Sequence, residues 1–226
     1  ASDVYKRQPL LVQLFISGMN SALTPWMYSK IKKGDIRSMR KVLQLLSIVV
    51  VGIAVALMLI SPELVLIFGS PKYREAVYVI PPVAASVFFI FIYNILSMPQ
   101  FYYEKTQFLM AASMAAAGAN VVLNFIFIRL FGYIAAGYTT LACYMLYSVG
   151  HYIVSKQILV NEGIQENLMN PGFLLACSVF LIGASIICNL IFPYRILRYA
   201  ILLASAGLVF WKKELLLKTM ADIRKK

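Results

Sequence analysis

Apolar runs of about 20 residues alternate with short polar segments along most of the chain. A helix rises about 1.5 Å per residue, so a run of this length matches the roughly 30 Å hydrocarbon core of a bilayer. We therefore predict an all-α fold, a polytopic membrane helix bundle with about seven transmembrane helices. The predicted spans are residues 9–28, 42–60, 77–99, 108–128, 133–154, 172–192 and 194–211.

Polar side chains recur at helical spacing inside several of these runs. A polar stripe on a spanning helix cannot face lipid cheaply, so it must face either a partner helix or a wet cavity. The sequence leaves both interpretations open, and for His151 it favours a packed, hydrogen-bonded residue over a proton carrier. The candidate cavity residues are Gln13, Ser17, Asn20 and Thr24 in the first span, Asn94 in the third, Asn120 and Asn124 in the fourth, and Thr140, Tyr144, Tyr147 and His151 in the fifth.

Prolines and charges are expected to mark the ends of the spans. Pro62 is predicted to break the second helix, which leaves Glu63 in a loop. Pro81 and Pro82 are predicted to kink the third span near its start. No Lys, Arg, Asp or Glu is expected deep inside a span, and this argues against a proton pump or cation exchanger, which place a carboxylate in the membrane.

Composition agrees with a membrane protein. Hydrophobic residues make up 61% of the chain and the mean hydropathy is +0.79, whereas soluble domains are roughly half apolar. The net charge of +12 does not indicate nucleic-acid binding, because the basic residues lie in short segments between apolar runs. The three cysteines lie inside apolar runs without paired spacing, so we expect no metal site, disulfide framework or cofactor.

The basic residues also predict the orientation of the chain. Seven alternating spans place two thirds of the 21 basic residues on the side that holds residues 29–41 and the basic tail 212–226. Since cytoplasmic segments are rich in Lys and Arg, we expect this side and the C-terminus to be cytoplasmic. Residues 1–8 are expected to be an extraneous or disordered leader, and the chain to be a fragment of a longer protein.

Four stretches carry a resemblance to a known family: MNSALTPWMYSKIKKGD, FGSPKYREAVYVIPPVAASVFFIF, FYYEKTQ and NVVLNFIFIRLFGYIAAGYTTLACYMLYSVGHYI. In this order they resemble the C-terminal lobe of Wzx-type oligosaccharide flippases, which belong to the MOP superfamily together with MATE exporters and lipid II flippases. The resemblance covers about residues 9–157, and the two additional helices in residues 172–211 match only in number and hydropathy.

The resemblance implies a bacterial cytoplasmic membrane transporter rather than an enzyme. Its substrate would be an undecaprenyl-diphosphate-linked oligosaccharide used in surface polysaccharide biosynthesis. The expected partners are this lipid-linked oligosaccharide, membrane lipids, a missing N-terminal lobe of the same chain and other polysaccharide assembly proteins. The fragment would hold half of the central cavity and would not transport alone. The diphosphate would need cations, for which the candidates in the loops are Lys30, Lys32 and Lys105.

Two other classes remain open from the sequence. A MATE-like cation-coupled exporter would share the fold and would be favoured by an acidic residue in the absent lobe. A membrane polysaccharide polymerase would need a long external loop with Arg, His or acidic residues for glycosyl transfer, and the predicted external loops are short.

Overall fold

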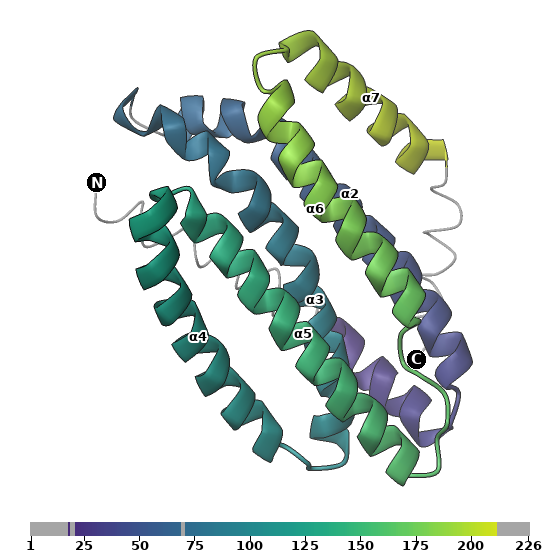
Figure 1. Cartoon of the computed structure of the whole chain (residues 1–226). Coiled ribbons are helices and arrows are strands. Elements are labelled where there is room, and N and C mark those ends of the chain that lie inside the picture. The colour runs from purple at the N-terminus through teal and green to yellow at the C-terminus, as the bar shows by residue number, and fades with distance from the viewer. Residues whose placement is uncertain (1–17, 19–20, 69–70, 212–226) are drawn as a thin grey trace.

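The computed structural model describes residues 18, 21–68 and 71–211, and in this part of the chain all regular secondary structure is helical, without a strand (Figure 1). The predicted all-α class is therefore confirmed. A helical segment, residues 21–32, precedes the labelled elements. These are α2 (Ile36–Phe68), the 3-10 helix η1 (Pro71–Tyr78), α3 (Ile80–Tyr102), α4 (Gln107–Phe131), α5 (Ala135–Asn161), α6 (Pro171–Ile191) and α7 (Arg195–Trp211).

Local chemistry sets where the helices begin and end. Before α2, Gly34 adopts a φ of 67°, which favours glycine, and the Asp35 carboxylate accepts a hydrogen bond from the Ser38 amide. At the start of α6, the Asn170 side chain accepts from the amides of Gly172 and Phe173. Pro81 and Pro82 lie in the first turn of α3, where a missing amide proton costs nothing. The predicted span therefore changes from the 3-10 helix η1 to α3 directly before these prolines.

The core forms around α3. This helix packs against α5 on one side and against α2 and α6 on the other, and its Phe88, Ile92 and Leu96 side chains are buried. Helix α4 packs against α5 at one edge of the bundle and has no buried residue, whereas α7 lies across α2 and α6 at the opposite edge (Figure 1). The fold thus places the facing surfaces of α3 and α5 at its centre.

Four of the helical stretches are long and apolar enough to cross a membrane: Ile36–Ile67, Glu75–Tyr102, Gln107–Phe131 and Pro171–Ile191. They correspond to the second, third, fourth and sixth predicted spans, and they indicate a multi-pass membrane protein. The fifth and seventh predicted spans are helices α5 and α7 but are not among these four. Polar residues interrupt the apolar run of α5, and 17 residues of α7 are described. Most of the first predicted span, the leader and the tail lie outside the described residues.

The prediction that Pro62 breaks the second helix was wrong. Helix α2 continues through Pro62 to Phe68. Proline removes the amide that would bond to the Met58 carbonyl, but the Ser61 hydroxyl donates to that carbonyl at 2.8 Å. The freed acceptor is therefore satisfied inside the helix, which is a condition for a proline within an apolar span.

Candidate functional site

Aromatic and polar side chains meet where α3 faces α5. The Tyr93 ring on α3 lies 4.7 Å from the Tyr147 ring, 5.9 Å from His151 and 6.3 Å from Tyr144, measured between ring centroids. We call Tyr93, Tyr144 and Tyr147 the tyrosine cluster, and all three are half-buried. The structure thus brings three members of the predicted α5 stripe to one surface. It adds Tyr93 of α3, which was not among the predicted cavity residues, although its neighbour Asn94 was.

His151 is fully buried below this cluster. Its Nδ1 lies 2.7 Å from the amide nitrogen of Gln100, which also donates to the Leu96 carbonyl. Among the described residues, the other imidazole nitrogen, Nε2, and the Gln100 Oε1 atom have no hydrogen-bond partner. The rings of Tyr147 and Phe108 contact His151 edge to face. This environment agrees with a packed, hydrogen-bonded histidine.

Other predicted residues join α4 to α5. The Tyr147 hydroxyl lies 2.8 Å from the Ser113 hydroxyl on α4. Asn124 donates to Asn120, and its carbonyl oxygen accepts from Thr139 of α5 at 2.6 Å. Such hydrogen bonds between helices contribute about 0.6 kcal/mol each. Asn124 therefore links α4 to α5, and Asn120 bonds to Asn124 within α4.

Of the remaining polar candidates, Thr140, Asn94 and Thr24 have hydrogen-bond partners outside the tyrosine cluster. Thr140 donates to the carbonyl of Ala136 in its own helix, and Asn94 donates to that of Ile90. The Thr24 hydroxyl contacts the Met98 sulfur at 3.5 Å. Gln13, Ser17 and Asn20 lie outside the described residues. One contact that the sequence reasoning missed is the Ser148 hydroxyl, which donates to the Phe89 carbonyl across the α3–α5 interface.

Two of the three predicted diphosphate-binding bases are already paired. Lys30 binds Asp35 at 2.5 Å, and Lys105 binds Glu162 at 2.8 Å. Lys32 is exposed and has no ion pair with another described residue. Beside the second pair, burial and then the negative charge of Glu162 raise the pKa of Tyr103. Uncompensated positive charge at these three positions is thus confined to Lys32.

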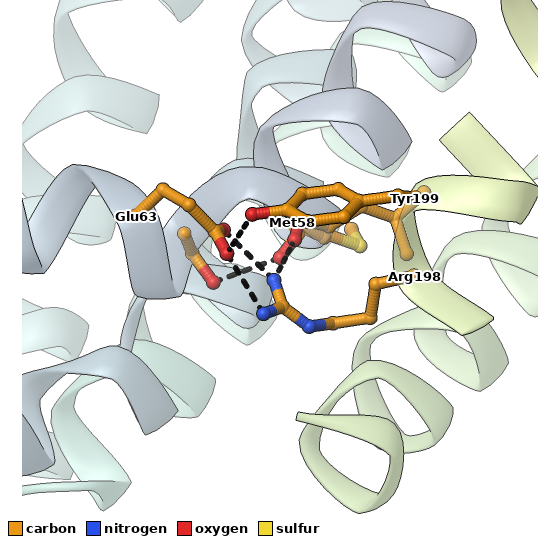
Figure 2. Close-up of polar contacts among 6 residues, drawn as sticks. Met58, Glu63, Arg198 and Tyr199 are labelled. Atoms are coloured by element: carbon orange, nitrogen blue, oxygen red, sulfur yellow. Dashed lines mark hydrogen bonds and ion pairs between the residues drawn. The ribbon is translucent and has the colours of Figure 1, made fainter. Parts of the chain in front are cut away.

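A buried ion pair joins α7 to α2 (Figure 2), and its acid, Glu63, lies within α2 and not in the predicted loop. Arg198 is 1% exposed and donates through Nη1 and Nη2 to both carboxylate oxygens of Glu63, each at 2.8 Å. Its Nη1 also donates to the Leu59 carbonyl, and the Tyr199 hydroxyl donates to Glu63. The sequence showed only two opposite charges near the ends of distant apolar runs, which does not identify them as partners.

A largely apolar cavity of about 280 Å³ lies between α3, α5 and α6. Its lining includes Phe88, Phe89, Met145, Leu174 and Leu175, and none of the predicted site residues is among its lining residues. Within the described ranges, no group of three or more His, Cys, Asp or Glu side chains could hold a metal ion. The polar surface and this cavity are therefore separate features.

Together, the helical fold and the four apolar helices indicate a multi-pass membrane protein. No family model, curated protein or solved structure matches the chain. The resemblance to Wzx-type flippases therefore rests on the four stretches quoted above.

Proposed function

We propose that the chain is part of a membrane transporter that moves a polyprenyl-diphosphate-linked oligosaccharide from one leaflet to the other. It would contribute one wall of the path for the glycan, and a further lobe of the same protein would contribute the opposite wall. In this proposal the protein moves the glycan across the membrane and makes or breaks no covalent bond in the sugar. Its particular assignment to Wzx-type flippases follows the sequence resemblance.

The tyrosine cluster is the observation that carries this proposal. A glycan crossing a membrane needs neutral hydrogen-bonding groups and aromatic faces against which pyranose rings can pack. Tyr93, Tyr144 and Tyr147 supply both, and each is half-buried between helices. An arrangement built for packing alone would not need three hydroxyl-bearing rings on one surface, because phenylalanine fills the same space without a polar group.

The cation-coupled exporter is the second candidate, since Glu63 lies within an apolar helix and not in the predicted loop. An exporter of this class needs a carboxylate that can exchange a proton or cation for its substrate. Both oxygens of Glu63 are bound by Arg198, which compensates the charge. The ion pair therefore favours a structural role for Glu63, and we place the oligosaccharide transporter first.

Complementation with the full-length gene that contains this sequence tests the proposal. The gene would be expressed in a bacterium that lacks its own oligosaccharide flippase, and surface glycan would be measured at equal membrane abundance of each variant. Tyr93→Leu and Tyr147→Leu should abolish glycan export, because both remove a ring and a hydroxyl from the proposed path. The matched control is Phe180→Leu on α6, where the ring is 56% exposed away from the cluster.

Tyr147→Phe separates a glycan path from a packing role. It keeps the ring contacts and loses the hydroxyl that meets Ser113. Partial export by this variant and none by Tyr147→Leu would support the proposal. Efflux of cationic dyes by the full-length protein, without glycan export in hosts with several different repeat units, would overturn it in favour of the exporter.

A further inference from the structure

Four exposed basic residues gather at the start of α2 without compensating acids. Lys32 and Lys33 lie at the end of helical segment 21–32 and in the turn that follows it, and Arg37 and Lys41 lie one turn apart on α2. In contrast, the two neighbouring bases are neutralised by acids: Lys30 binds Asp35, and Arg40 binds Glu166. None of the four has an ion pair with any residue in the described part of the chain. We call these four residues the basic row.

Beyond Gln44, which lies on the same face between Lys41 and Ile48, the surface below the basic row is apolar. Arg37, Lys41, Ile48 and Gly52 follow one another at steps of four, seven and four residues, so they share one face of α2. Ile48 is 54% exposed, and a side chain added at Gly52 would meet nothing within 4 Å. At about 1.5 Å per residue, Ile48 lies about 10 Å further along the helix than Lys41. Positive charge at the end of the span thus continues into an open apolar face.

We propose that the basic row and this face of α2 bind an anionic phospholipid. The headgroup, with its net negative phosphate, would lie against Lys32, Lys33, Arg37 and Lys41. An acyl chain would lie along Ile48 and Gly52. Charge complementarity identifies the headgroup, and the apolar continuation distinguishes a lipid from a free phosphate ion. The inference requires only that α2 lies in a membrane, so it stands apart from the proposed oligosaccharide transport.

Native mass spectrometry of the detergent-solubilised full chain tests this inference. The protein would be titrated with phosphatidylglycerol, with phosphatidylcholine of the same acyl chains and with inorganic phosphate. A base near an anionic headgroup strengthens binding by about fivefold. We therefore expect Arg37→Gln/Lys41→Gln to weaken phosphatidylglycerol binding by about fivefold to thirtyfold. Arg37→Lys/Lys41→Arg, which keeps both charges, should bind as the parent does.

The matched control is Lys156→Gln/Arg195→Gln, which removes the same charge from two exposed positions on α5 and α7. It should retain phosphatidylglycerol binding. Circular dichroism of each variant would establish that the helices persist. Three results would overturn the inference: equal affinity for the two lipids, equal losses in the test and control variants, or equally strong binding of inorganic phosphate.

Discussion

At the scale of residues, a proline within an apolar helix is accommodated by side chains from near and far in the sequence. Pro62 leaves the Met58 carbonyl without its amide partner, and Ser61 occupies that acceptor. One residue further on, the Leu59 carbonyl accepts from Arg198 of α7. The weak point of α2 is therefore also the point at which the last helix is attached.

Ser61→Ala should reduce the stability of the protein. The substitution leaves the Met58 carbonyl buried without its hydroxyl partner, which costs about 1–3 kcal/mol. Ser47→Ala is a close control, because Ser47 is also fully buried in α2 and donates to the carbonyl four residues earlier, where no proline has removed the amide. Unfolding in a denaturing detergent, followed by circular dichroism, would measure both. Equal losses would show that Ser61 has no special role at Pro62.

Arg198→Met should destabilise the contact between α7 and α2. Breaking a buried ion pair costs about 3–5 kcal/mol, and we expect the lower end because the Glu63 side chain is 26% exposed. The same unfolding measurement applies. Arg195→Met, at an exposed position of the same helix, should change stability by less than about 0.5 kcal/mol.

The double variant Glu63→Gln/Arg198→Met completes this test, because it removes both charges and should recover much of the loss. A double variant as unstable as Arg198→Met would mean that the contact with Leu59, and not the charge pair, holds α7 in place.

At the scale of elements, the first turn of α5 lies close against the start of α3. A Cβ atom at Gly137 would lie 2.8 Å from Pro82 and 2.9 Å from the Val79 carbonyl oxygen, both at the start of α3. A carbonyl oxygen and a proline ring cannot move aside as a flexible side chain can. The position of α5 against α3, and so the geometry of the tyrosine cluster, depends on this glycine.

Gly137→Ala should therefore lower stability by about 1–3 kcal/mol, the usual cost of overpacking. Gly52→Ala is the matched control, because it lies in α2 with open space around it and should gain up to about 1 kcal/mol from helix propensity. Both values would come from unfolding in detergent. A neutral or stabilising Gly137→Ala would contradict the close approach of the two helices.

At the scale of the whole molecule, the number of membrane crossings follows from the sides on which the links lie. If α2, α3, α4 and α5 all cross, residues 162–170 lie on the same side as Lys32 and Glu104, and Tyr133 lies on the other. If α5 does not cross, Tyr133 and residues 162–170 share one side. Helix α5 is central to the fold and carries two of the three clustered tyrosines. Whether it crosses the membrane therefore decides where the tyrosine cluster lies relative to the bilayer.

Labelling of single cysteines with a membrane-impermeant maleimide would decide the matter. Lys32→Cys, Glu104→Cys and Glu162→Cys should react from one side, and Tyr133→Cys from the other, in a full-length background without Cys143, Cys177 and Cys188. All four positions to be labelled are exposed, and the Glu162 side chain is 35% exposed. Reaction of Tyr133→Cys and Glu162→Cys from the same side would exclude α5 as a span.

The sequence alone determined the helical class and four long apolar helices, because an apolar run of given length dictates a helix that satisfies its own backbone. Helical spacing also placed Tyr144, Tyr147 and His151 on one face before any neighbour was known. What those side chains meet was decided by tertiary structure: Gln100 and Tyr93 from α3 surround that face. The pairing of Glu63 with Arg198 depends on packing that brings together residues 135 positions apart, which no local pattern records.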